Sequence, residues 1–347
     1  MESKSVEKRR RRWLLPVVIA LLLTLFVGIY LYHLIFAPFT LSQTTYLFID
    51  REMDYEAVVQ QIKDKSGLPS EGMFRLLAEK MNYPNHVKSG RYAIENGMTV
   101  PGLIRQLRSG IQTPIHLTFN NIRTAEELAG GLSRQLLIDS LSLLQTFNDS
   151  ATAAAYGFNS HTFLAMFIPN TYQVYWDTDA AHLVRRMNRE YKAFWNDGRR
   201  GKAMAIGLTP VEIATLASIV EEEATFADEY ATIAGLYLNR LKKGMPLQAD
   251  PTVKFAVGDF SLRRILFRHL EVESPYNTYQ HTGLPPGPIR IPSIRAIDAT
   301  LSPQQHHYLF MCAKEDLSGR HNFATTNAQH ERNAAAYRQA LNQRGIY

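Results

Sequence analysis

A long uncharged segment is the first feature in the pattern of hydrophobic and polar positions. No Asp, Glu, Lys or Arg occurs from Trp13 to Ile49, and the apolar stretch WLLPVVIALLLTLFVGIYLYHLIF covers 24 residues. About 20 apolar residues in a helix span the hydrocarbon core of a bilayer, whereas the apolar part of a cleaved signal peptide has only about 7–15. We therefore predict an uncleaved transmembrane helix over residues 13–36.

The next part of the chain combines strand and helix patterns and predicts a small α+β module over residues 44–112. Alternating apolar positions indicate the strands, and Asp54, Ser70 and Thr99 are residue types that begin helices. The predicted elements are a strand over 44–51, helices over 54–65 and 70–81, a strand that begins at residue 89, and a helix that ends at Gly110.

A mainly helical pattern follows over residues 114–347, which we expect to form a second domain. Polar amides, Pro, Gly and aromatic residues alternate after Lys243, and such loops on a helical scaffold commonly carry binding residues. The predicted elements are strands over 114–120 and 167–176 and helices over 124–138, 140–148, 180–198, 209–227, 228–243 and 327–344. The fold class expected for the whole chain is therefore α+β with an N-terminal transmembrane helix.

The helix predicted over 209–227 carries a carboxylate on its apolar side. Its start is marked by Thr209 as N-cap, by a proline at N1 and by a glutamate at N3. At about 100° per residue, Glu223 falls within the stripe formed by Ile213, Leu216, Val220 and Ala227. A carboxyl group that loses water has a raised pKa and holds a proton near neutral pH, as a general acid must.

The alternative interpretation of the same residues is a solvated run of charge. Glu221 and Glu222 are placed by the helical period on the two flanks of the stripe, and three consecutive glutamates commonly face water. The phase of Glu223 is the observation that favours a catalytic role over this alternative.

Charge and composition add information on topology and exclude several classes of function. The net charge is +6, and the first twelve residues hold six Lys or Arg and two Glu, so four of these charges are local to that tail. The four arginines Arg9–Arg12 place residues 1–12 in the cytoplasm by the positive-inside rule. The large C-terminal part is then expected outside the cytoplasmic membrane, in the periplasm if the cell has an outer membrane. The charge gives no indication of nucleic acid as a partner.

Cysteine content and motifs give no indication of a disulfide, a metal or a cofactor. The chain has one cysteine, Cys312, which excludes an intrachain disulfide. We find no zinc-binding, P-loop or dinucleotide-binding motif. The protein is therefore expected to work with its own side chains alone.

The loops after Lys243 contain the side chains that a carbohydrate groove needs, namely amides, hydroxyls and aromatic rings. Each group also has a structural alternative: Asp250 as a helix cap, Asn277 as a turn residue, and His321 with Phe323 as the closure of a β-turn. The candidates for substrate binding are Gln248, Asp250, Thr252, Asn277, Tyr279, His321 and Phe323.

Five motifs occur in order along this region and carry a family resemblance. They are LASIVEEEAT (216–225), NRL (239–241), LQADPTV (247–253), YNTY (276–279) and GLPPGPI (283–289). Together with SGRY and FIPNTY they strongly resemble the YceG-like family of membrane-anchored endolytic murein transglycosylases. Three positions depart from the family pattern. Glu222 stands where other members often carry Lys, Thr225 lies one residue later than the Thr of the usual E-x-E-T, and Asn170 stands where FPDTY has Asp.

The resemblance implies specific roles and folds. Glu223 corresponds to the second Glu of the family's E-x-E, the catalytic acid, and Glu221 to the first, which supports the substrate site. Residues 114–347 would form a lysozyme-like, mainly helical catalytic domain with a β-rich insertion, and residues 44–112 a LysM-like, glycan-binding module. The expected partners are peptidoglycan glycan strands, the cytoplasmic membrane and peptidoglycan synthases.

The resemblance also implies the reaction. Hydrolytic glycosidases use two carboxylates, whereas the sequence offers one in an apolar setting. The expected reaction is endolytic cleavage of the β-1,4 bond between N-acetylmuramic acid and N-acetylglucosamine in nascent strands. It would leave 1,6-anhydro ends and limit chain length. The alternatives are a membrane-anchored muramidase that hydrolyses the bond, a non-catalytic glycan-binding scaffold, and a partner protein of the wall synthases.

Overall fold

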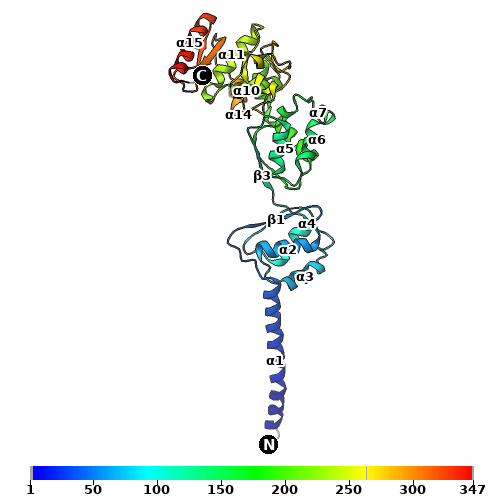
Figure 1. The fold of residues 1–347 in the computed structure, drawn as a ribbon. Coiled ribbons are helices and arrows are strands. Elements are labelled where there is room, and N and C mark those ends of the chain that lie inside the picture. The colour runs from blue at the N-terminus through cyan, green and yellow to red at the C-terminus, as the bar shows by residue number, and fades with distance from the viewer. Residues whose placement is uncertain (1–2, 263, 346–347) are drawn as a thin grey trace. The chain divides into compact units, whose positions relative to one another are not determined.

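The N-terminal part of the chain is one long helix in the computed structural model, which describes residues 3–262 and 264–345. Helix α1 (Ser3–Ile35) contains an apolar span, Leu15–Ile35, of 21 residues with a mean hydropathy of 2.4. None of this span is buried against the rest of the described chain (Figure 1). The predicted apolar helix is thus confirmed, and its length and composition suit a single membrane crossing.

A first compact unit comprises the described residues up to His116 together with Gln173–Asp177. Two antiparallel strands pair in the register Thr45 with Ile94 and Ile49 with Gly90. Its elements are β1 (Thr45–Ile49), α2 (Tyr55–Ser66), α3 (Glu71–Lys80), β2 (Gly90–Ile94) and α4 (Val100–Ser109). All five were predicted from the sequence, and helices pack on the strand pair around a core that includes Leu47, Ile62 and Leu103.

Local side-chain contacts explain why the helices of this unit begin where they do. Asp54, Ser70 and Thr99 each accept a hydrogen bond from a backbone N–H in the first turn of the helix that follows. Gly110 ends α4 in the left-handed conformation, which glycine adopts without steric cost.

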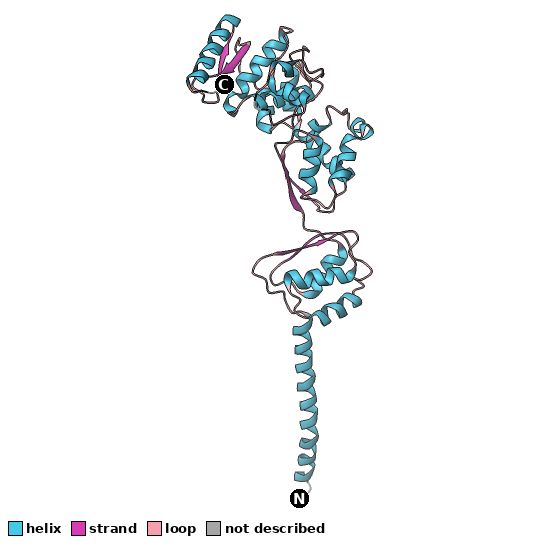
Figure 2. Cartoon of the chain, viewed as in Figure 1, coloured by secondary structure: helices cyan, strands magenta, loops and turns pink. Residues whose placement is uncertain are grey.

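The second compact unit comprises Leu117–Tyr172 and the described residues from Thr178 onward, and it is mainly helical. Helices α10, α11 and α14 pack on one another, and a strand hairpin packs on the last helix (Figures 1 and 2). Its helices are α5 (Ala125–Ser133), α6 (Ser140–Asn148), α7 (Ser150–Ala155), α8 (Ala180–Phe194), α9 (Asp197–Ile206), α10 (Pro210–Glu223), α11 (Tyr230–Lys242), α12 (Asp250–Val257), α13 (Phe267–Leu270), α14 (Ile294–Thr300) and α15 (Asn327–Gln343). Two 3₁₀ turns, η1 (Phe163–Met166) and η2 (Ala227–Glu229), interrupt this order.

The remaining strands of the described chain form two-stranded sheets. Strand β3 (Ile115–Phe119) pairs with β4 (Asn170–Val174), and both strands were predicted. Strands β5 (Phe310–Ala313) and β6 (His321–Ala324) form an antiparallel hairpin that the sequence analysis did not predict. The fold is therefore mixed α+β, with a mostly helical body and small sheets.

Several helix boundaries differ from the prediction. The helix predicted over 209–227 ends at Glu223, because Ala224 has an extended backbone, so Ala227 does not belong to its apolar stripe. The helix predicted over 180–198 ends at Phe194, and Asn196 caps a separate helix, α9. Helices α7, α13 and α14 were not predicted, because short helices in loop-rich sequence have little periodic signal. Helix α12 was expected only in the alternative in which Asp250 caps a helix.

Candidate active site

Helix α10 is held in place by strong local signals at its start and by burial along its length. Thr209 and Glu212 form a reciprocal capping box, which satisfies two backbone N–H groups of the first turn. Ile213, Leu216 and Val220 are fully buried. The helix therefore presents Glu223, its last residue, at a fixed position at the edge of the core.

Glu223 lies at a cavity of about 480 Å³ within the second unit. The cavity contains several polar groups that converge from elements far apart in sequence, which is typical of a binding site. Its polar lining includes Glu223 from α10, Tyr237 and Arg240 from α11, Gln248, Asp250 and Tyr279 from the loops and α12, Cys312 and His321 from the hairpin, and His330 from α15.

The carboxyl group of Glu223 has a strongly altered protonation equilibrium. Burial raises its pKa to about 7, and the negative charges of Asp250 and Glu222 contribute in the same direction. The hydroxyl of Tyr237 donates a 2.6 Å hydrogen bond to Oε1 of Glu223, which opposes the shift. The rise predicted from the helical phase is confirmed, and Glu223 is therefore able to hold and release a proton near neutral pH.

A second carboxylate faces the same cavity. Asp250 is the first residue of α12, and its Oδ1 accepts a 2.6 Å hydrogen bond from the hydroxyl of Tyr279. Burial and this contact raise the pKa of Tyr279 far above its usual range, so its hydroxyl stays protonated and donates. Ala249 is the N-cap of α12 and no side chain caps it, so the alternative of Asp250 as a helix cap is wrong.

Gln248 and Arg240 form the adjoining wall. Arg240 is 6% exposed and donates to the backbone oxygens of Pro246 and Leu309 and to Oε1 of Gln248. Gln248 has a φ of 51°, a left-handed conformation that costs energy for a residue with a side chain. This backbone turn brings the Gln248 amide to the cavity.

Two predicted binding residues lie behind the cavity wall, outside its lining. The hydroxyl of Thr252 contacts the Ala249 oxygen and the Thr278 hydroxyl, and Thr252 is fully buried. The amide of Asn277 donates to two loop carbonyls and accepts from the Tyr279 backbone N–H. Both side chains therefore support the loops that carry Asp250 and Tyr279.

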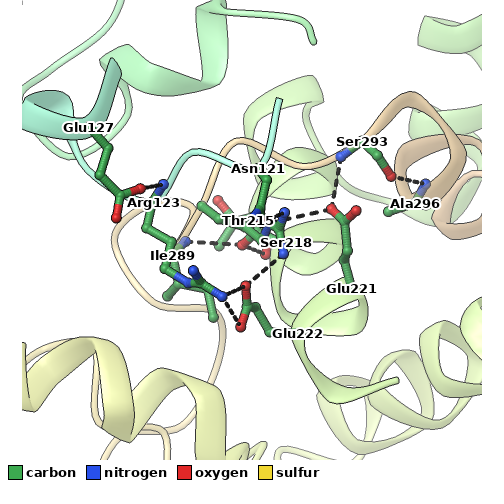
Figure 3. A network of polar contacts seen from close by, with 11 residues as sticks. Asn121, Arg123, Glu127, Thr215, Ser218, Glu221, Glu222, Ile289, Ser293 and Ala296 are labelled. Carbon is green, nitrogen blue, oxygen red and sulfur yellow. Dashed lines mark hydrogen bonds and ion pairs between the residues drawn. The ribbon is translucent and has the colours of Figure 1, made fainter. Parts of the chain in front are cut away.

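Glu221 and Glu222 take part in a partly buried polar network at the end of α10 (Figure 3). Glu222 accepts from Arg123 at 2.9 Å and from Arg290 at 2.6 Å, and its side chain is 15% exposed. Glu221, 12% exposed, accepts from the backbone N–H of Ser293 at 2.8 Å. The alternative of a solvated charge run is therefore wrong for these residues.

The loop that contains GLPPGPI is fixed against α10 by a buried contact. The backbone N–H of Ile289 donates to the Ser218 hydroxyl at 3.0 Å, and both residues are almost fully buried (Figure 3). At Gly287 an added Cβ would lie 2.1 Å from the backbone oxygen of His161, so only glycine permits this approach. This packing places Arg290 beside Glu222.

The last two predicted residues belong to β6. His321 lines the cavity and contacts the buried carboxylate of Glu229. Phe323 stacks on Tyr308 with ring centroids 5.5 Å apart, outside the cavity lining. Both residues lie in strand β6, and His321 pairs with Ala313 beside the turn of the hairpin, so closure of a turn describes His321 but not Phe323.

Four polar cavity residues were not predicted from the sequence as site residues: Tyr237, Arg240, Cys312 and His330. Arg240 lies in the quoted NRL motif, but nothing in its local pattern indicated a cavity. Tyr237 occurs among the apolar positions of α11, and its contact with Glu223 depends on how two helices pack. Among the residues that the structure describes, no group of three or more His, Cys, Asp or Glu side chains is arranged to hold a metal ion.

Comparisons with known proteins agree on one family. The model of the YceG-like family matches residues 47–336. An endolytic murein transglycosylase of Bacillus subtilis is 28% identical over 309 residues, a match that covers 83% of each protein. A Streptococcus pneumoniae protein of the same name is 25% identical over 314 residues, which cover 79% of this chain and 55% of that relative.

A solved structure gives a corresponding result for the fold. The crystal structure of a YceG-like protein from Listeria monocytogenes is similar with a TM-score of 0.56 and 24% identity. The match covers 84% of this chain and 99% of that chain. The chain spans most of the Bacillus relative but about half the length of the pneumococcal one.

Proposed function

Because the chain belongs to the YceG-like family, we propose that it is a lyase that cleaves peptidoglycan strands, an endolytic lytic transglycosylase. The single observation that carries this proposal is the position of Glu223, partly buried at a polar cavity with a pKa of about 7. The printed names of two relatives, both endolytic murein transglycosylases, support the same substrate class.

In the proposed reaction, Glu223 is both acid and base. Its carboxyl proton passes to the oxygen that bridges N-acetylmuramic acid and N-acetylglucosamine, and the bond from C1 to that oxygen breaks. The neighbouring N-acetyl group stabilises the charge at C1. The Glu223 carboxylate then takes the proton of the C6 hydroxyl, whose oxygen bonds to C1 and closes a 1,6-anhydro ring. The acid is regenerated, and no water is consumed.

Physical reasons favour this route at this site. A nucleophile on the same sugar has a large effective concentration, so no water molecule needs to be positioned. A pKa near 7 allows the same group to donate a proton and then to accept one. The hydroxyl of Tyr237 at 2.6 Å stabilises the carboxylate that exists between the two steps.

The parts of the chain have complementary roles in this proposal. Residues 114–347 are the lysozyme-like catalytic domain, and residues 44–112 are a LysM-like module that binds glycan. Residues 13–36 anchor both outside the cytoplasm, with the basic residues 1–12 inside. Cleavage would then be limited to nascent strands near the membrane and the synthases, and it would limit their length.

One observation favours a second candidate, a membrane-anchored muramidase. Asp250 is exposed at the same cavity as Glu223. Hydrolytic glycosidases usually have two carboxylates that flank the scissile glycosidic bond. In that case the Asp250 carboxylate would activate a water or act as the nucleophile, and the products would carry an additional water.

The test is a digest of purified peptidoglycan by the full chain in detergent, followed by mass spectrometry of the products. Internal fragments with 1,6-anhydro-N-acetylmuramic acid ends, absent with Glu223→Gln, are the expected result. Products heavier by one water would indicate the muramidase, and Asp250→Asn would then abolish them. A parent chain that binds strands and releases no fragments would instead indicate a glycan-binding scaffold or a synthase partner.

The cellular part of the proposal has its own test. Cells that carry Glu223→Gln in place of the parent are expected to have longer glycan strands, measured by chromatography of strands freed from their peptides. Unchanged strand length would contradict the chain-length role while leaving the chemistry intact.

A further inference from the structure

A buried carboxylate holds one imidazole of the cavity wall by two contacts. Oε1 of Glu229 accepts the backbone N–H of His321 at 3.1 Å, and Oε2 lies 3.1 Å from Nδ1 of the same residue. The side chains of Glu229 and His321 are only 10% and 13% exposed. Glu229 ends the turn η2 that follows α10, and His321 begins β6, so the pair joins elements 92 residues apart.

The two contacts determine which ring nitrogen remains for a ligand. An ionised carboxylate only accepts hydrogen bonds, so the nitrogen that faces it must carry the proton. Nδ1 is therefore the donor to Glu229, and in the neutral ring Nε2 has a free lone pair. Within the described residues, no hydrogen-bond partner is found for Nε2, and the ring lines the cavity that contains Glu223.

The position of the ring is also restricted by the backbone contact. Because Glu229 binds both the main chain and the side chain of His321, it limits the rotation of the imidazole and its distance from the cavity. Phe323 adds a ring contact at 6.2 Å between centroids. An imidazole that served only to join β6 to η2 would need no access to a polar cavity.

We propose that Glu229 is a positioning residue and that it directs Nε2 of His321 to accept a hydrogen bond from the glycan. The donors that a peptidoglycan sugar offers are hydroxyl groups and the acetamido N–H, and either has the required chemistry. This inference rests on the proposed function, because it takes the cavity at Glu223 as the glycan site. It assigns a role to Glu229, which does not line the cavity.

The test uses two substitutions that preserve opposite nitrogens of the ring. In His321→Asn the amide replaces Nδ1 and keeps the contact with Glu229, but it has no atom at the position of Nε2. In His321→Gln the amide extends to the position of Nε2 and loses the contact with Glu229. If His321 has only a structural role, His321→Asn should preserve glycan affinity and His321→Gln should weaken it. If Nε2 binds the glycan, His321→Asn should weaken the affinity and His321→Gln should preserve it.

The measurement is the affinity for a tetrasaccharide of alternating N-acetylglucosamine and N-acetylmuramic acid, with the full chain in detergent. Glu223→Gln serves as a background, so that binding is measured without cleavage. Since one hydrogen bond is lost, His321→Asn and Glu229→Gln are each expected to weaken binding about fivefold to tenfold. His321→Gln is expected to remain within about threefold of the background.

Equal affinity in all variants would overturn the proposal. A weaker affinity in His321→Gln alone, or an equal loss of affinity in both His321 variants, would also overturn it. Melting temperatures measured beside the affinities separate a folding defect from a lost contact, and His321→Asn is expected to melt as the background does. The inference and the proposed function fail separately. A parent chain that binds the tetrasaccharide through His321 but releases no fragments would refute the lyase and leave this contact intact.

Discussion

The hydroxyl of Tyr237 and the carboxyl of Glu223 form a 2.6 Å hydrogen bond between two neighbouring helices, α11 and α10. Tyr237 is 1% exposed, and burial together with the neighbouring Glu223 raises its pKa well above the usual value. The tyrosine therefore stays a donor at every working pH. It stabilises the charged form of Glu223, and burial of the carboxyl acts in the opposite direction.

Tyr237→Phe is expected to move the pH dependence of cleavage. Without the donated hydrogen bond, the pKa of Glu223 should rise further above about 7. Because the acid form starts the reaction, the fall in kcat/KM at alkaline pH should occur at higher pH than in the parent. The lost contact to a charged group should also lower kcat about tenfold. A pH profile of product release measures both effects, and an unchanged alkaline limb would contradict the assignment.

Glu223→Gln is expected to abolish cleavage and to stabilise the fold above pH 7. The folded-state pKa of about 7 exceeds the ordinary value of 4.5, so the folded state holds a proton between these values and the unfolded state does not. The contribution of Glu223 to the free energy of unfolding of the parent therefore falls as the pH rises from about 4.5 to 7, and it is constant above pH 7. Relative to the parent, the variant should gain up to about 3 kcal/mol at pH 8 and little at pH 4. Melting curves at the two pH values measure the difference, and equal gains would refute this linkage.

Arg290→Gln is expected to destabilise the end of α10. Arg290 contacts Glu222 at 2.6 Å, and its side chain is 11% exposed. Removing one partner from a buried ion pair leaves an uncompensated charge. Because Arg123 remains as a second partner of Glu222, we expect the free energy of unfolding to fall by only about 2 kcal/mol. The matched control is Arg75→Gln, whose pair with Glu56 is exposed and should cost less than about 1 kcal/mol. Similar melting temperatures for the two variants would show that the network is unimportant.

Gly235→Ala is expected to disturb the helix that carries Tyr237. A Cβ at Gly235 would lie 2.4 Å from the backbone oxygen of Gln304 and 2.8 Å from Nε2 of His306, so α11 would have to move. Such overpacking costs about 1–3 kcal/mol, and displacement of Tyr237 should lower kcat as well. Gly201→Ala is the control, because Gly201 lies in helix α9 with open space around it, and Ala there should stabilise by up to about 1 kcal/mol. Activity and melting temperature should fall in Gly235→Ala and should not fall in Gly201→Ala.

Much of the fold could be predicted because its signals are local. Thr209 and Asp54 cap helices through contacts to backbone groups three residues away. The apolar helix over residues 13–36 could be predicted from the uncharged segment alone, because it depends on no contact with residues far away in the sequence. In the same way, the phase of Glu223 on α10 follows from the period of the helix alone. The loops, by contrast, have no period, so α13, α14 and the β5–β6 hairpin could not be predicted.

The sequence by itself thus determined an apolar N-terminal helix, the starts of the capped helices and a carboxyl group on an apolar stripe, since each depends on neighbours within a few residues. Only the tertiary structure decided what surrounds that carboxyl group. Tyr237 from the next helix donates a hydrogen bond to it, and Asp250 lines the same cavity. His321 also lines this cavity, and Glu229 holds its ring in place. These contacts join residues 14 to 92 positions apart, and packing of helices and loops, which no local pattern encodes, brings them together.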